Sequence, residues 1–324
     1  MCIPCSKTVS TFCRCRYFQK TRTDCRAGDR AHETDGFCAF LLIATGTLLG
    51  LILPLGKIAA QAGIPPAIWT FLFSASAGII LFAVLRLQGK KIGFSGGRLR
   101  YYICTAFVSY AVPNLLILSA IPRLGAGFTG IMYTLSPVIT LVLSMGFGLR
   151  RPNALGIGGI ALGFVGAVMV AMTRGEVGKP ADPLWIAAAL LIPVFLAIGN
   201  VYRTLDWPKS SDPTELAAGS HLASALMLFA GIFMLTGQFP IETLALAPWA
   251  ALVQSIASAG MFALFFRLQA VGGPVYLSQI GYVAAALGLI SGTLFLGEHY
   301  PPLTWIGALV ICAGVAMTTR AQKG

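Results

Sequence analysis

The chain has 324 residues, of which 56% are hydrophobic and 10% charged, and its formal net charge is +12. Soluble domains usually carry about 25% charged residues, whereas here the charges stand almost entirely in short connectors between apolar runs. This composition excludes a soluble globular protein and predicts an all-α polytopic membrane protein. The basic residues form no stripe interleaved with aromatics, so the net charge does not indicate a nucleic-acid partner.

Residues 1–37 form a basic segment rich in cysteine. Six of the eight cysteines lie within the first 38 residues, with Cys2 paired to Cys5 and Cys13 to Cys15 in sequence. Zinc sites need further ligands at a workable spacing, and none follows, so we expect no metal site. The segment predicts a disordered cytoplasmic tail with reduced thiols; a start codon assigned too far upstream would give the same pattern.

Ten apolar runs follow, each long enough to cross roughly 30 Å of hydrocarbon as a helix. They cover residues 38–56, 67–85, 101–119, 125–148, 154–172, 184–202, 216–236, 249–266, 272–296 and 303–319. The chain therefore predicts ten transmembrane helices in two groups of five, separated by the polar link 173–183.

The two groups repeat one another. Gly125 and Ser144 recur as Gly272 and Ser291 at a spacing of 147. After the intervening corner the spacing becomes 148, in the pairs Leu155 and Leu303, Gly159 and Gly307, Gly166 and Gly314, and Met169 and Met317. A unit with an odd number of spans starts its second copy from the opposite side, so residues 38–173 and 184–320 are predicted to be inverted repeats.

The distribution of basic residues supports this topology. With the N-terminus inside, only Lys57, Arg123, Arg174 and Lys179 of the 23 Lys and Arg residues lie outside. The others, Arg203 among them, fall on inner segments. The positive-inside rule therefore predicts that both termini are cytoplasmic.

Local signals mark bends and helix starts. Prolines interrupt the first, third, fourth and sixth runs, at Pro54, Pro113, Pro137 and Pro193. A proline frees a carbonyl and bends a helix, which favours a bundle whose halves can rock. The sequence Asp212-Pro213-Thr214-Glu215 predicts an N-cap followed by a capping-box acid at the start of the seventh run.

Glycines stand at helical spacing in the fifth run, at Gly159, Gly163 and Gly166, and in the ninth, at Gly281 and Gly288. Small residues let helices approach closely in lipid. They predict tight packing within the chain, with a dimerisation seam as the alternative.

No enzyme signature is present: the sequence has no P-loop, no histidine metal pair and no Gly-x-Ser-x-Gly elbow. We therefore expect neither catalysis nor a cofactor. The apolar runs also lack an internal carboxylate of the kind that proton-driven pumps use as a relay. His221, in the seventh run, is the one embedded group that titrates near neutral pH; the alternative is a histidine hydrogen-bonded between helices.

Uncharged polar residues supply the candidate binding site. Amide and phenol groups facing lipid would cost free energy, so they should face protein or a water-filled cavity. Interhelical hydrogen bonds and cavity lining are both open. We predict that Asn114, Tyr133, Gln279 and Tyr282 line a cavity.

Lys57 and Asn200 occupy equivalent positions when Gly56 is laid on Gly199. Lys57 either extends to the membrane interface or attracts an anionic group at the outer mouth. Both residues join the candidate substrate-binding set.

The run from Tyr133 to Val138, with its Ser136-Pro137 step, the segment Leu294 to Glu298 and the closing helix between Gly307 and Gly314 resemble the EamA-type members of the drug/metabolite transporter superfamily. The resemblance covers about residues 38–320. It implies ten helices in inverted repeats around a central cavity, in a transporter of small metabolites in the bacterial inner membrane. The chain departs from the family pattern at Arg150, where a glutamate is usual, and in the uncharged start of its second span.

The sequence therefore predicts a secondary transporter that works by alternating access. A cavity poor in acids cannot hold an organic cation, so the expected solute is a neutral, zwitterionic or anionic metabolite such as an amino acid. The expected partners are this small molecule and the lipid bilayer. The alternative is a non-transporting membrane scaffold or sensor whose polar groups are all paired internally.

Overall fold

The computed structural model describes residues 27–149, 153–171, 183–297 and 299–321, and within these ranges it contains helices and no strands. The elements are α1 (Ala27–Gln61), α2 (Pro66–Leu87), α3 (Gly96–Thr105), the π-helix η1 (Ala106–Ala111), α4 (Val112–Leu124), α5 (Ala126–Met132), the 3-10 helix η2 (Tyr133–Leu135), α6 (Ser136–Gly146), α7 (Ala154–Ala171), α8 (Pro183–Leu205), α9 (Pro213–Thr236), the 3-10 helix η3 (Ile241–Leu246), α10 (Pro248–Ser278), α11 (Ile280–Leu296) and α12 (Pro302–Ala321). Helix α1 begins at Ala27, so the end of the predicted disordered tail is helical. The paired cysteines of that tail lie outside the described residues.

Six helical segments in the described part of the chain are long and apolar enough to cross a membrane: Phe37–Gln61, Pro66–Leu87, Gly96–Leu124, Pro183–Leu205, Pro213–Thr236 and Pro248–Ser278. Four shorter apolar helices accompany them, Tyr133–Gly146, Ala154–Gly166, Ile280–Phe295 and Pro302–Thr318. Each of these segments overlaps one of the ten predicted runs. The chain is thus a multi-pass helical membrane protein.

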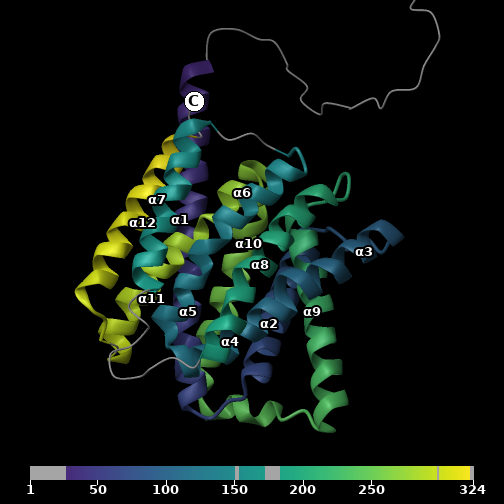
Figure 1. Cartoon of the computed structure of the whole chain (residues 1–324). Helices are drawn as coiled ribbons and strands as arrows, with labels where there is room; N and C mark the ends of the chain where they lie inside the picture. Colours follow the sequence, from purple (N-terminus) through teal and green to yellow (C-terminus); the bar gives the residue numbers. More distant parts are fainter. Residues whose placement is uncertain (1–26, 150–152, 172–182, 298, 322–324) are drawn as a thin grey trace, which may run out of the picture.

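The helices pack in a pattern that repeats between the two halves of the chain. Helix α1 contacts α10 and α11, and the corresponding helix of the second half, α8, contacts α4 and α6. Equivalent helices also meet each other, α2 against α9 and α7 against α12. The start of α1 and the end of α12 lie at the same end of the bundle (Figure 1). These contacts fit the predicted two-repeat architecture.

Helices α7 and α12 pack backbone to backbone through glycines. A Cβ atom added to Gly159 would lie 2.8 Å from the carbonyl oxygen of Gly314, and one added to Gly166 would lie 2.6 Å from that of Gly307. The four glycines of the predicted repeat therefore meet at this seam, each against the one that is not its equivalent: Gly159 faces Gly314, and Gly166 faces Gly307. The predicted close packing is intramolecular at this seam.

Several helices lose regular geometry just before a proline. The π-helix η1 precedes Pro113, and the 3-10 turn η2 ends immediately before Ser136 and Pro137. Proline cannot bond the carbonyl four residues earlier, which belongs to Ser109 in the first case and Tyr133 in the second. In α10, Gly273 has a positive φ of 72° and interrupts the helix before Pro274. In the first half, Gly125 also has a positive φ, of 83°. The repeat pairs Gly125 with Gly272, so the two breaks differ by one residue from the predicted alignment.

Acidic residues fasten the segment 88–95, between α2 and α3, to the start of α9. Asp212 caps α9 by accepting from the Thr214 N–H at 2.8 Å, and Lys90 Nζ donates to the same carboxylate at 2.5 Å. Partial burial acts to raise the pKa of Asp212, but these hydrogen bonds outweigh it and hold the pKa below its ordinary value.

Glu215 does not complete the predicted capping box. Its Oε1 accepts instead from the Gly93 N–H at 2.9 Å and the Tyr102 hydroxyl at 3.1 Å, and it lies 3.2 Å from Arg98 Nη1. The predicted N-cap is thus confirmed, whereas the acid three residues later holds a neighbouring segment in place.

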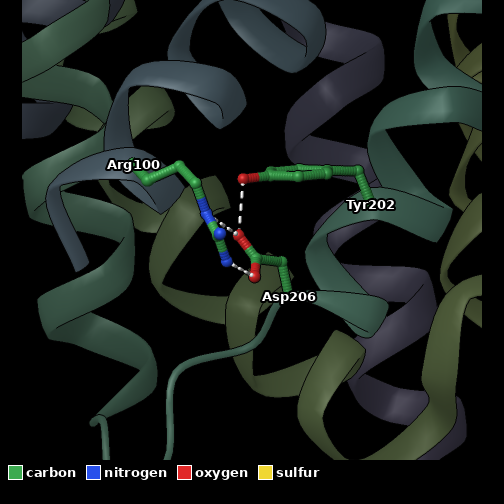
Figure 2. A network of polar contacts seen from close by, with 3 residues as sticks. All are labelled: Arg100, Tyr202 and Asp206. Carbon is green, nitrogen blue, oxygen red and sulfur yellow. Dashed lines mark hydrogen bonds and ion pairs between the residues drawn. The ribbon is translucent and has the colours of Figure 1, made fainter. Parts of the chain in front are cut away.

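A second charged contact joins α3 to the end of α8 (Figure 2). The guanidinium group of Arg100 makes two hydrogen bonds to the carboxylate of Asp206, one of them from Nε at 3.2 Å. Tyr202 donates its hydroxyl to the same carboxylate at 2.7 Å. Together, the contacts of Asp206, Asp212 and Glu215 connect α2, α3, α8 and α9 at one end of the bundle.

Candidate functional site

A cavity lies between the two halves of the chain. It contains about 520 Å³ of space between atoms, and its wall is formed by α1, α2, η1, α4, η2 and α6 from the first half and by α8, α10 and α11 from the second. Its polar lining residues are Ser109, Tyr110, Asn114, Tyr133, Ser136, Asn200, Arg203 and Ser278.

The helix irregularities described above place several of these side chains. Ser109 and Tyr110 belong to the π-helix η1, and Tyr133 opens the 3-10 turn that Ser136 follows. A π-helix and a 3-10 turn both depart from the 3.6 residues per turn of an α-helix, so they change the direction in which side chains leave the helix. These residues therefore reach one cavity from two different helices.

Three of the predicted site residues meet at the cavity: Asn114 on α4, Tyr133 on η2 and Asn200 on α8. Asn200 is 5% exposed, and its amide donates towards Thr140 Oγ1 at 3.5 Å, a weak contact. The predicted spans three, four, eight and nine all contribute to the wall, together with spans one, two and six.

Gln279 and Tyr282 do not belong to the cavity lining. The Gln279 side-chain oxygen accepts from the Thr318 hydroxyl of α12 at 2.6 Å. The Tyr282 ring is 1% exposed, and its hydroxyl oxygen lies 2.6 Å from where a Cβ on Gly163 of α7 would stand. Both residues join α11 to the α7–α12 pair, because the short α11 presents this face to those helices.

His221 and Lys57 also lie outside the lining. His221 is fully buried, with its ring 3.7 Å from that of Phe262 and 4.0 Å from that of Tyr110, centroid to centroid. Neither ring nitrogen has a hydrogen-bond partner among the described residues, which therefore do not form the interhelical hydrogen bond of the alternative interpretation. The residue stands directly behind two side chains of the cavity wall. Lys57 is half-buried near the end of α1.

Arg203 is the lining residue that sequence reasoning missed, because it was counted among the inner connector charges. It lies inside α8 and is only 2% exposed. Its Nε donates to Gln269 Oε1 at 2.7 Å and its Nη2 to Asn200 Oδ1 at 2.6 Å. The guanidinium carbon stands 4.8 Å from the centroid of the Phe265 ring and 5.8 Å from that of Tyr110. The i, i+3 spacing from Asn200 was a signal that could have placed it on the same helix face.

The cavity wall contains no carboxylate among the residues that the structure describes. Within the same ranges no cluster of His, Cys, Asp and Glu could hold a metal ion. The arrangement can therefore enclose a small solute and offer it hydroxyl, amide and guanidinium groups beside aromatic rings.

Several known proteins are similar to this chain in sequence or in fold. The model of the EamA-like transporter family matches residues 36–172 and 183–320. The uncharacterized transporter YoaV of Bacillus subtilis (strain 168) is 23% identical over 262 residues, which span 79% of this chain and 88% of YoaV. Protein PecM of Dickeya dadantii (strain 3937) is 24% identical over 269 residues, or 80% of this chain and 86% of PecM.

Among solved structures, one crystal structure aligns with a TM-score of 0.66 and 18% identity, over 88% of this chain and 97% of that one. At this identity the match shows the fold alone. The family model covers both halves of the chain, and the family is one of transporters. The chain belongs to the EamA-like transporter family.

Proposed function

We propose that this transporter moves a small neutral, zwitterionic or anionic metabolite, of amino-acid type, across the bacterial inner membrane by alternating access. The observation that carries the proposal is a cavity formed by both halves whose described lining has no carboxylate. An organic cation would lose its hydration there without meeting an opposite charge. Asn114, Tyr133 and Asn200 are the proposed solute contacts from the predicted set.

We further propose that the four shorter apolar helices also cross the membrane, which gives ten spans in two inverted repeats, residues 38–173 and 184–320, with both termini cytoplasmic. Two features support this topology. The packing of α1 on α10 and α11 is matched by that of α8 on α4 and α6, and the start of α1 and the end of α12 lie on the same side of the bundle (Figure 1).

The proposed motion is a rocking of one half against the other. The π-helix, the 3-10 turn and the break at Gly273 supply points where helices can bend beside the cavity. In the present state, the centre of a water-sized sphere can move through only about 50 Å³ of the cavity. This is room for a few waters, so an amino acid needs a more open state to enter.

Uptake into proteoliposomes tests the solute class. Purified protein should accumulate one or more labelled amino acids, and it should not accumulate a labelled quaternary ammonium compound of similar size. An Asn114→Ala variant should lower uptake several-fold, since one amide–solute hydrogen bond contributes about 1 kcal/mol. Gln88→Ala, which removes an exposed amide just after α2, is the control. Preferential uptake of the cation would refute the proposal.

A further inference from the structure

The buried guanidinium of Arg203 has no opposite charge near it. Among the residues that the structure describes, no carboxylate forms an ion pair with it, although the side chain is 2% exposed. A buried cation is normally paired with an acid, because its desolvation is costly. The neutral oxygens of Asn200 and Gln269 orient this cation without neutralising it.

A second row of polar atoms holds those two acceptors in place. The Gln269 amide donates to the Asn200 carbonyl oxygen at 3.0 Å and to Thr204 Oγ1 at 3.1 Å. Gly199 keeps the space beside the guanidinium free, since a Cβ there would lie 3.2 Å from Arg203 Nη1 and would also collide with Ser109. The cation is therefore fixed in direction and left accessible from the cavity.

Hydroxyl groups without partners line the same cavity. The side-chain oxygens of Ser109, Tyr110 and Ser136 are buried and make no hydrogen bond to any part of the chain that the structure describes. Buried hydroxyl groups normally have a hydrogen-bond partner. Each of these three can donate a hydrogen bond to an acceptor that enters the cavity. A fixed cation surrounded by free donors matches a group with several acceptor oxygens and a negative charge.

The rest of the wall is apolar. Phe73, Phe262 and Phe265 supply aromatic faces, and Met261 and Ile280 extend the apolar surface. We propose that Arg203, assisted by the hydroxyls of Ser109, Tyr110 and Ser136, binds the carboxylate of an organic solute whose apolar body lies against these rings. This inference rests on the proposed function and narrows it: the carboxylate is the recognised group, and an ammonium group is not required.

Binding to the purified full-length protein tests the inference with three probes of nearly equal shape. These are 3-phenylpropanoate, its neutral amide 3-phenylpropanamide, and phenylalanine, and their affinities are compared by equilibrium dialysis. The acid should bind about tenfold to a hundredfold more tightly than the amide, as expected for hydrogen bonds to a charged group. It should bind at least as tightly as phenylalanine, whose ammonium group finds no carboxylate in the wall.

Arg203→Gln should reduce the affinity for the acid to that for the amide and leave the amide affinity unchanged. Arg203→Lys should keep part of the preference for the acid, because it retains the charge but loses the planar fork. Ser136→Ala should weaken binding of the acid a few-fold. Arg267→Gln, an exposed arginine on α10, is the matched control and should bind like the unmodified protein.

Equal affinity of the unmodified protein for acid and amide would overturn the inference even if the Arg203 variants fail to fold. A folded Arg203→Gln variant that still prefers the acid would overturn it too. Competition by inorganic phosphate as strong as that by the acid would show a site for small oxyanions rather than organic acids. Transport of an amino acid combined with equal acid and amide binding would leave the proposed function standing and remove this inference alone.

Discussion

The contact between α7 and α12 depends on single glycines. At Gly159 the nearest atoms to an added Cβ are the Thr318 methyl and, at 2.8 Å, the backbone atoms Gly314 O and Thr318 N. Backbone atoms cannot turn aside as a side chain can, so an alanine there would push the two helices apart.

Gly159→Ala should therefore destabilise the protein by about 1–3 kcal/mol, the usual cost of overpacking. The preceding residue on the same helix provides the control, because a Cβ on Gly158 would meet only the flexible end of Met317 at 3.5 Å. Gly158→Ala should be neutral or slightly stabilising. Thermal melting in detergent measures both variants, and equal melting temperatures would contradict the packing described for this seam.

Arg203 shows why single residues of the site escape sequence reasoning. A basic residue at the inner end of an apolar run fits the positive-inside rule, and nothing local separates it from a true connector charge. Its burial depends on Gln269, which is distant in sequence, and on the space left by Gly199. Asn114 and Tyr133 could be predicted because an unpaired polar group in an apolar run must face inward. The same rule could not tell an inner cavity from a helix contact, as Gln279 and Tyr282 demonstrate.

At the scale of elements, two carboxylates hold the segment 88–95 against α9: Asp212, which accepts from Lys90, and the buried Glu215. Glu215 is 4% exposed and contacts Gly93, Arg98 and Tyr102. A glutamine would keep an acceptor but lose the charge, so the segment should be held less firmly.

Glu215→Gln should accelerate tryptic cleavage after Lys90 and Lys91 about fivefold, which corresponds to a loss of about 1 kcal/mol. Glu242→Gln changes an exposed carboxylate on η3 and should leave the cleavage rate as it was. Unchanged cleavage in the Glu215 variant would show that the Lys90–Asp212 contact or apolar packing, rather than Glu215, holds this segment.

The positions of helix starts and bends could be predicted from the sequence, but the contacts that their side chains make with other segments could not. The Asp212 cap and the irregularities before Pro113 and Pro137 follow from local chemistry. The partners of Glu215 do not follow from local chemistry. An acid at the third helical position can accept a hydrogen bond either from its own N-cap or from a neighbouring segment, with similar energy. The tertiary arrangement decides between them.

For the whole molecule, the repeat was the strongest prediction because it depends on the order of many residues and tolerates errors of one or two positions. The breaks at Gly125 and Gly273 illustrate that tolerance, as they fall one residue away from the predicted alignment. The short helices α6 and α11 could not be distinguished from full spans by composition alone, since apolar runs continue beyond the regular helix in each case.

Cysteine labelling tests the proposed ten-span topology. In a cysteine-free background, Gln61→Cys at the end of α1 should react with an impermeant maleimide in intact cells, because this turn is proposed to be outside. Lys209→Cys, between α8 and α9, should react only after the membrane is permeabilised, and both positions are exposed in the structure. Labelling of both cysteines from the same side would require a different number of crossings.

The alignment that lays Gly56 on Gly199 lays Ala60 on Arg203. The contacts between helices repeat in the two halves, whereas this cation stands on only one of them. If Arg203 binds the solute, a molecule that enters from one face of the bilayer meets a guanidinium group. A molecule that enters from the other face meets the methyl group of Ala60 at the equivalent position. The half-saturation concentrations measured from the two faces should then differ, and the carrier should show an intrinsic sidedness although its fold has none.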